Sequence, residues 1–242
     1  MSDLLIFWRK LACAGLALLL VATPTPARPQ ETLSDVVWTI LDHLGITTAP
    51  VGMLGEGGTA KGEIWIAASD GSKRHRLTDR VEYSWPVFTA DGEAVLALRG
   101  ASLVRIESGS PVPVTLAEDT PLNKLLGARP HGSVVGIVPE GPFGRLATVA
   151  PSGSVTLLPA PATREEKRLM AALLGESRAY RNHRKLLVDR ADFEDHTRRG
   201  FDVYIETAKG RLNLSQCETS ACGQPSLSPQ GDWVAYIRNP QS

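Results

Sequence analysis

A pattern of short strands and tight turns occurs twice along this chain, and it restricts the possible fold more than any other feature. The first copy consists of IWIA (64–67), SDG (69–71), RLTD (76–79), YSWPVF (83–88), DG (91–92) and AVLAL (94–98). The second copy, in the same order, consists of DVYI (202–205), AKG (208–210), RLNL (211–214), QPSLSP (224–229), QG (230–231) and WVAYI (233–237). Short strands separated by Gly, Asp and Pro turns are typical of all-β repeat proteins.

The turns between the two copies predict how many units the chain contains. One series of hairpin turns lies at Gly71, Gly109, Gly153 and Gly210, and the other at Gly92, Gly132, Asn182–His183 and Gly231. Both series have four members, so residues 62–238 divide into units of about 44 residues, the size of a four-stranded propeller blade. The repeat region opens on two outer strands and ends on two inner ones. We therefore predict a small β-propeller of about four four-stranded blades, closed by N- and C-terminal half-blades. A fragment of a larger propeller and assembly from two chains are the alternatives.

The two copies resemble the repeat of TolB-type β-propeller proteins, a family with WD40-like repeats. In that repeat a segment of the form (I/V)(Y/W)(V/I)xDxxG…xRLT precedes xPxWSPDGxxIAF. Here Phe88 and Leu227 stand where the family usually has Trp, and Gln230 replaces the turn Asp. The resemblance implies rigid blades that present loops and a channel mouth to another protein.

The N-terminus has the features of a secretory signal, predicted over residues 1–27. Arg9 and Lys10 precede the uncharged run LACAGLALLLVA (11–22), and small residues follow up to a Thr25–Ala27 triplet. Twelve helical residues rise only about 18 Å, less than the hydrocarbon core of a bilayer at about 30 Å. An uncleaved anchor over Leu4–Ala22 is the alternative, and a cleaved signal would leave no stable membrane span. Either interpretation predicts a periplasmic or secreted domain.

Residues 28–61 are predicted to form a short amphipathic helix and a linker ahead of the propeller (62–238), with a tail at 239–242. The helix is indicated over Thr32–Leu44 by apolar residues at three- and four-residue spacing. These residues are Leu33, Val36, Val37, Ile40, Leu41 and Leu44.

Charge and motif content indicate a binding protein rather than an enzyme. The chain has 26 basic and 26 acidic residues, so its charge gives no reason to expect nucleic acid as a partner. Gly175–Ala179 falls short of a nucleophile elbow because Ala179 replaces the final Gly. The five histidines are scattered. We therefore predict no catalytic residue, no cofactor and no metal site.

The cysteines predict one disulfide. Cys13 lies in the signal, which leaves Cys217 and Cys222 to pair in an oxidising compartment. Nearby, Asn213–Leu214–Ser215 matches a glycosylation acceptor pattern, but its place at the Leu–Thr end of the repeat predicts a structural role.

Two insertions in the third unit, 159–168 and 190–200, are longer than hairpins require and contain charges of both signs. Propellers commonly bind partners through loops on one rim, so the second insertion is the candidate contact loop. Its candidate residues are Arg190, Asp192, Phe193, Glu194, Asp195, His196, Arg198 and Arg199. The predicted function is an exported, non-catalytic protein-interaction module whose partner is another envelope or secreted protein. The alternatives are a channel enzyme acting on glycan or peptide and an accessory propeller of an envelope enzyme complex.

Overall fold

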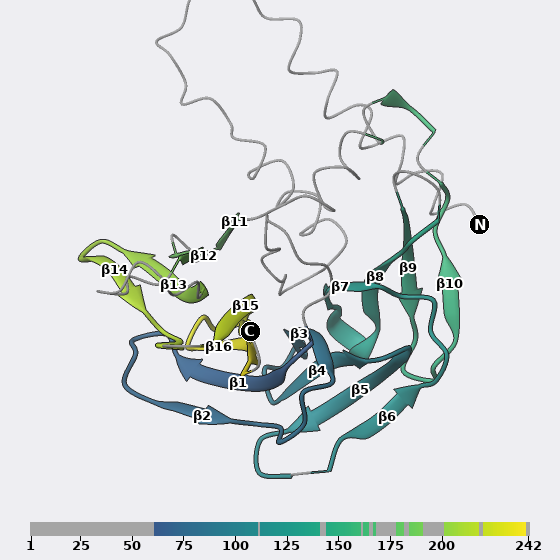
Figure 1. Cartoon of the computed structure of the whole chain (residues 1–242). Coiled ribbons are helices and arrows are strands. Elements are labelled where there is room, and N and C mark those ends of the chain that lie inside the picture. The colour runs from purple at the N-terminus through teal and green to yellow at the C-terminus, as the bar shows by residue number, and fades with distance from the viewer. Residues whose placement is uncertain are drawn as a thin grey trace, which may run out of the picture. The chain divides into compact units, whose positions relative to one another are not determined.

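The structure, a computed structural model, describes residues 61–110, 112–140, 144–160, 162–164, 167, 178–181, 184–190, 201–217 and 220–240 (Figure 1). For residues 178–181 and 184–190 it describes the backbone. The chain divides into two compact units, Met1–Thr32 and Leu33–Ser242, and all of the described residues belong to the second. The predicted signal, helix and linker up to residue 60 lie outside the described residues.

Two antiparallel sheets follow the order of the sequence. The first consists of β3 (Tyr83–Phe88), β4 (Ala94–Arg99), β5 (Ser102–Glu107) and β6 (Val114–Ala117). The second consists of β7 (Lys124–Ala128), β8 (Val134–Val138), β9 (Arg145–Val149) and β10 (Val155–Leu157). A 3-10 turn at Pro130–Gly132 joins β7 to β8.

The first and last strands of the described chain share one sheet. β1 (Glu63–Ala68) pairs with β16 (Trp233–Asn239) from Glu63↔Arg238 to Ala68↔Trp233. β2 (Arg74–Arg76) lies outside β1, and β15 (Ala221–Leu227) lies on the far side of β16. Strands far apart in sequence thus complete one four-stranded run, β15-β16-β1-β2, which leaves neither β1 nor β16 as an open edge.

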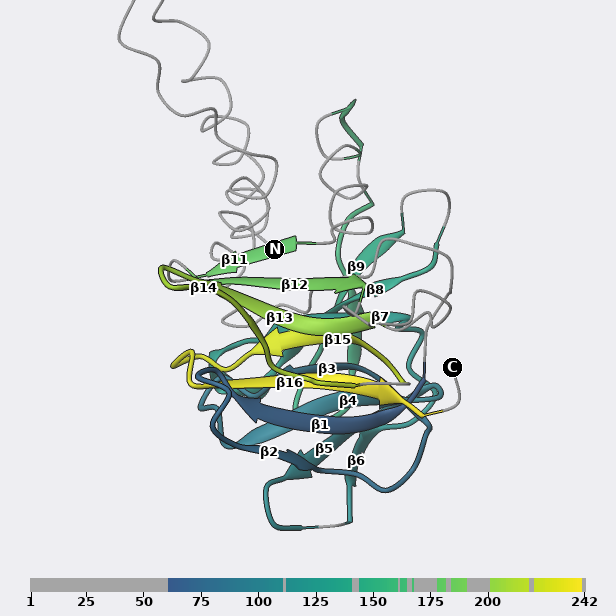
Figure 2. The same ribbon diagram turned by 60° about the vertical axis from the view of Figure 1, so that its left-hand side comes forward.

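Four further strands extend this sheet beyond β15. β11 (Arg178–Arg181), β12 (Arg184–Arg190), β13 (Phe201–Thr207) and β14 (Gly210–Asn213) are antiparallel neighbours. They join β15 through a single parallel pair, Phe201↔Ala221. Figure 2 shows β12, β13, β15, β16 and β1 following one another. The all-β prediction is confirmed, and the curled sheets agree with a propeller-like fold. The number of blades stays a prediction.

The two sequence copies form the same hydrogen bonds. Ile64 N donates to Thr78 Oγ1 at 2.8 Å, and Val203 N donates to Ser215 Oγ at 2.9 Å. In the first copy Leu77 N also donates to the Ile64 carbonyl, and the second copy has the equivalent backbone bond. A hydroxyl after the Leu thus satisfies a buried backbone donor at the same place in each copy, which is why the repeat has Thr or Ser there.

The turn glycines are equivalent as well. Gly92, Gly132 and Gly231 have φ values of 81°, 80° and 80°, a left-handed conformation that side chains rarely adopt. Each donates its N–H to the carbonyl of the residue three positions earlier. The turn positions of the sequence pattern are therefore fixed by backbone geometry.

Three apolar cores lie between neighbouring groups of strands. One packs β1 and β16 against β3, β4 and β5, and a second packs β3–β5 against β7, β8 and β9. The third packs β1, β15 and β16 against β13 and the disulfide. Phe88 and Leu227, which stand at the family's Trp position, are each 4% exposed. A large apolar side chain is therefore sufficient there.

Candidate functional site

The residues predicted as site residues fall in two places. Cys217 and Cys222 form the predicted disulfide, with a Cα–Cα distance of 6.2 Å and both cysteines fully buried. Arg190 is the last residue of β12. The rest of the candidate contact loop lies outside the described residues: Asp192, Phe193, Glu194, Asp195, His196, Arg198 and Arg199.

A buried carboxylate lies beside the disulfide. Asp202 Oδ1 accepts from Ser215 Oγ and from Cys217 N, each at 2.6 Å, and Oδ2 accepts from Asn213 Nδ2 at 2.9 Å. Ser215 is 1% exposed and its hydroxyl also accepts from Val203 N, so the Ser–Asp pair is engaged in the fold. The side chain that would carry a glycan, Asn213, is bonded to Asp202. These bonds agree with the structural role predicted for the Asn213–Ser215 segment.

Two strained positions mark the strands β3 and β15. The pairing of β3 with β4 is irregular between Ser84 and Val87, and β15 has a similar irregularity after Gly223. Trp85 and Gln224 lie in these bulges with φ values of 53° and 51°. Both residues precede a proline, and helical backbone conformations are unfavourable at such a position. A left-handed conformation costs a non-glycine residue about 1–2 kcal/mol. Such strain is often found at functional sites.

The side chains at these bulges meet a third strand. Trp85 N donates to Gln224 Oε1 at 2.5 Å, so the bulge of β3 is bonded directly to that of β15. Lys124, the first residue of β7, places Nζ 4.8 Å from the centre of the Trp85 ring. We call Trp85, Lys124 and Gln224 the inner-strand cluster. The cluster joins β3, β7 and β15, which are the first strands of the groups β3–β6, β7–β10 and β15-β16-β1-β2.

The inner-strand cluster combines a positive charge with an unused donor. Lys124 and Gln224 are buried, whereas Trp85 is partly exposed. The Trp85 Nε1 atom is itself buried and has no hydrogen-bond partner among the described residues. Leaving such a donor unpaired costs about 1–3 kcal/mol. The arrangement suits a group that accepts a hydrogen bond and carries negative charge.

Two of the three cluster residues share a sequence feature from which the bulges could have been predicted. Trp85–Pro86 and Gln224–Pro225 occupy the same place in the two copies. A bulky or polar residue before proline within a strand indicates a bulge. Lys124 has no such signal, because its position depends on how β7 packs beside β3.

Other site types were sought in the described part of the chain. No group of three or more His, Cys, Asp and Glu residues there could hold a metal ion. No helix among these residues is both long enough and apolar enough to cross a membrane.

Comparison with known proteins gave structural similarity only. No family model matches the chain, and no curated protein matches it. A putative TolB from Agrobacterium tumefaciens is 16% identical with a TM-score of 0.35, over 74% of this chain and 62% of that one. TolB from Acinetobacter baumannii is 14% identical with the same TM-score, over 76% of this chain and 50% of that one. A catalytically inactive virginiamycin B lyase from Staphylococcus aureus, solved with quinupristin, is 12% identical with a TM-score of 0.26, over 78% of this chain and 66% of that one. The chain thus spans less than two thirds of the length of either TolB structure.

Proposed function

We propose that this chain is an exported TolB-like propeller of four four-stranded blades that acts as a non-catalytic protein-interaction module. The strand pairings support this grouping, because β3–β6, β7–β10, β11–β14 and β15-β16-β1-β2 are each four antiparallel strands. Its partner is another protein of the envelope or the secreted fraction.

The inner-strand cluster carries the proposal. The cluster contains two left-handed residues and an unpaired indole N–H, each of which reduces stability, and a buried lysine lies beside them. A partner segment that offers a carbonyl or carboxylate oxygen to Trp85 Nε1 near the Lys124 ammonium satisfies that donor. Binding then offsets the free-energy cost of leaving the Trp85 Nε1 donor unpaired.

Capture of partners by the tagged full chain from its native envelope tests the proposal. Trp85→Phe keeps a ring but removes the donor, and Lys124→Met keeps the aliphatic stem but removes the charge. Trp233→Phe is the matched control, because Trp233 lies at the start of β16 against His75 rather than in the cluster. Loss of one neutral hydrogen bond reduces affinity about 2- to 10-fold, and loss of a charged one by about 10-fold or more.

Wild type and the control variant are expected to retain the same partner, and the two cluster variants to lose most of it. Circular dichroism and thermal melting establish that each variant is folded. Equal capture by all four proteins would remove the inner-strand cluster as the binding site. A further variant without residues 191–199 tests the candidate contact loop, and unchanged capture would exclude that loop.

A further inference from the structure

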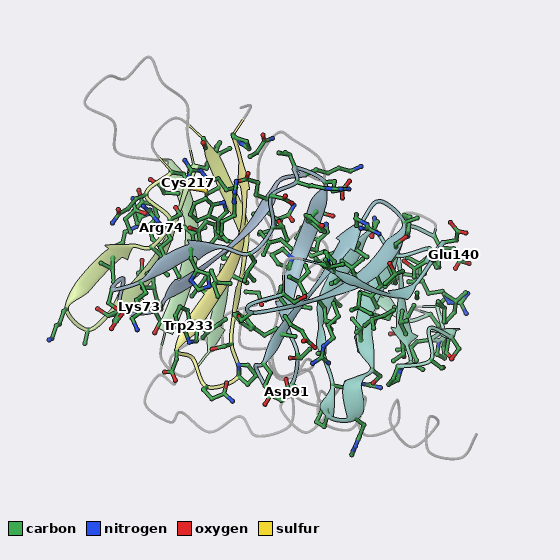
Figure 3. The ribbon with its side chains drawn as sticks, turned by 90° about the horizontal axis from the view of Figure 1, so that it is seen from below. Lys73, Arg74, Asp91, Glu140, Cys217 and Trp233 are labelled. Atoms are coloured by element: carbon green, nitrogen blue, oxygen red, sulfur yellow. A yellow bond between two sulfur atoms is a disulfide. The ribbon has the colours of Figure 1, made fainter. Side chains whose placement is uncertain are left out.

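One face of the β16-β1-β2 sheet carries three arginines around a tryptophan. The register pairs Trp65 with Arg76 and Ala67 with Arg74 across β1 and β2, and Glu63 with Arg238 across β1 and β16. Alternate residues of a strand share a face, so Trp65, Arg74, Arg76 and Arg238 project to the same side. We call these four residues the arginine face. Arg74 lies in the same part of the molecule as Cys217 (Figure 3), and its Nη1 donates to the Ser215 carbonyl.

The positive charge of this face is only partly balanced. Glu63 is the acceptor for both Arg76 Nη1, at 3.1 Å, and Trp65 Nε1, at 2.9 Å. Arg238 lies 5.0 Å from the Trp65 ring centre and donates Nε to Ser220 Oγ at 3.4 Å. Within the described ranges, neither Arg74 nor Arg238 forms a salt bridge with a carboxylate. Two guanidinium groups thus have terminal donors available.

A buried hydroxyl lies under the same residues. Tyr236, which pairs with Trp65, is fully buried, and its hydroxyl has no hydrogen-bond partner among the described residues. Burial raises the pKa of Tyr236, while the positive charges of Arg74 and Arg238 act in the opposite direction. The hydroxyl is therefore a neutral donor within electrostatic reach of both arginines. An acceptor placed between them would satisfy it.

We propose that the arginine face is a binding site for a carboxylate of an acidic protein segment, held by Arg74 and Arg238 with the Tyr236 hydroxyl as a third donor. Glu63 is the internal precedent, because its carboxylate already bridges a guanidinium and an indole on this face. Arg74 and Arg76 belong to the outermost strand, where they are exposed and a partner can reach them.

This site is separate from the inner-strand cluster and does not depend on it. Guanidinium–carboxylate pairs are the strong, planar class of charged hydrogen bond. Loss of one such bond is expected to weaken binding by about 10-fold or more.

Titration of the full-length protein with a fluorescent hexaglutamate peptide at 0.15 M salt tests the proposal, with hexaglutamine as the neutral peptide and inorganic phosphate as competitor. Arg74→Met and Arg238→Met are expected to weaken hexaglutamate binding by about 10-fold each. Tyr236→Phe is expected to weaken it by about 2- to 10-fold without loss of thermal stability, because the hydroxyl it removes is unpaired. Lys209→Met removes a charge outside the arginine face and is expected to change binding by less than about 2-fold, as screening limits distant charges.

Three results would overturn the proposal. Hexaglutamate and hexaglutamine could bind equally, which would mean that the carboxylates are not recognised. Lys209→Met could weaken binding as much as Arg74→Met, which would mean that overall charge is responsible. Displacement of the peptide by phosphate at the same concentration would mean that the face takes any oxyanion. If Arg238→Met unfolds the protein, the hexaglutamate affinity of Arg74→Met alone decides whether the proposal stands. Trp85→Phe in the same titration is expected to bind normally, so the two sites can fail independently.

Discussion

Replacement of Asp202 by alanine should destabilise the protein by about 3–6.5 kcal/mol. The carboxylate is 3% exposed and accepts hydrogen bonds from Ser215, Cys217 and Asn213. Loss of the acceptor for the buried Cys217 N–H costs about 1–3 kcal/mol, and loss of the charged bond from Ser215 about 1.5–3 kcal/mol. The bond from the partly exposed Asn213 adds about 0.5 kcal/mol, because water replaces it.

Urea denaturation under non-reducing conditions measures this change, with tryptophan fluorescence and far-UV circular dichroism as independent probes. Asn213→Ala is the matched control, expected to cost about 1 kcal/mol, because it removes the weakest of the three bonds and the exposed bond that Asn213 Oδ1 accepts from Gln216 N. Asp202→Asn keeps one acceptor oxygen and is expected to fall between the two. A loss below about 1 kcal/mol for Asp202→Ala would refute the reasoning, because the carboxylate would then merely exchange its bonds for water.

Three other changes have expected outcomes. A threonine hydroxyl in the same turn holds the pKa of Asp91 below its usual range, so Asp91 stabilises the fold above the unfolded-state pKa, and this contribution disappears as pH falls through the lower folded-state pKa. Because Asp91 is exposed, Asp91→Asn should cost only about 0.5 kcal/mol at pH 7 and less at pH 2, measured by urea denaturation at both. Replacement of Cys217 and Cys222 together by alanine should cost about 2 kcal/mol, since the closed loop is short; an unchanged urea midpoint would contradict this. Gly136→Ala should lower the melting temperature by several degrees and weaken partner capture, because its Cβ would come 2.7 Å from the Lys124 carbonyl; normal binding would contradict the second part.

The sequence was sufficient for the strands and turns that rest on local chemistry. The turn at Gly92 could be predicted because only glycine adopts its backbone conformation readily. The disulfide could be predicted because two cysteines remain once the signal is set aside. Ser215 could be assigned a structural role from its place in the repeat. In each of these cases, residues close together in the sequence decide the structure.

The candidate sites depend instead on pairings that periodicity does not encode. The inner-strand cluster joins Trp85 to Gln224, which are far apart in the chain, and both lie in bulges that interrupt the alternation of a strand. The arginine face depends on the register between β1 and β16, where a shift of one residue would turn Arg238 to the opposite side. Alternation of apolar and polar residues predicts a strand but not which strand lies beside it.

The strained bulge of β15 and the disulfide are linked by position. Cys222 lies two residues before the left-handed Gln224, and Pro225 comes directly after Gln224. The strand is therefore constrained on both sides of Gln224. The strain at Gln224 costs about 1–2 kcal/mol, and a bridge over so short a loop contributes about 2 kcal/mol. A cross-link stabilises the fold mainly by restricting the unfolded chain, so the disulfide offsets a cost of this size in the stability of the whole domain. Because Cys222 lies two residues from the strained position, we expect the inner-strand cluster to lose its shape before the sheets lose theirs when the bridge is absent.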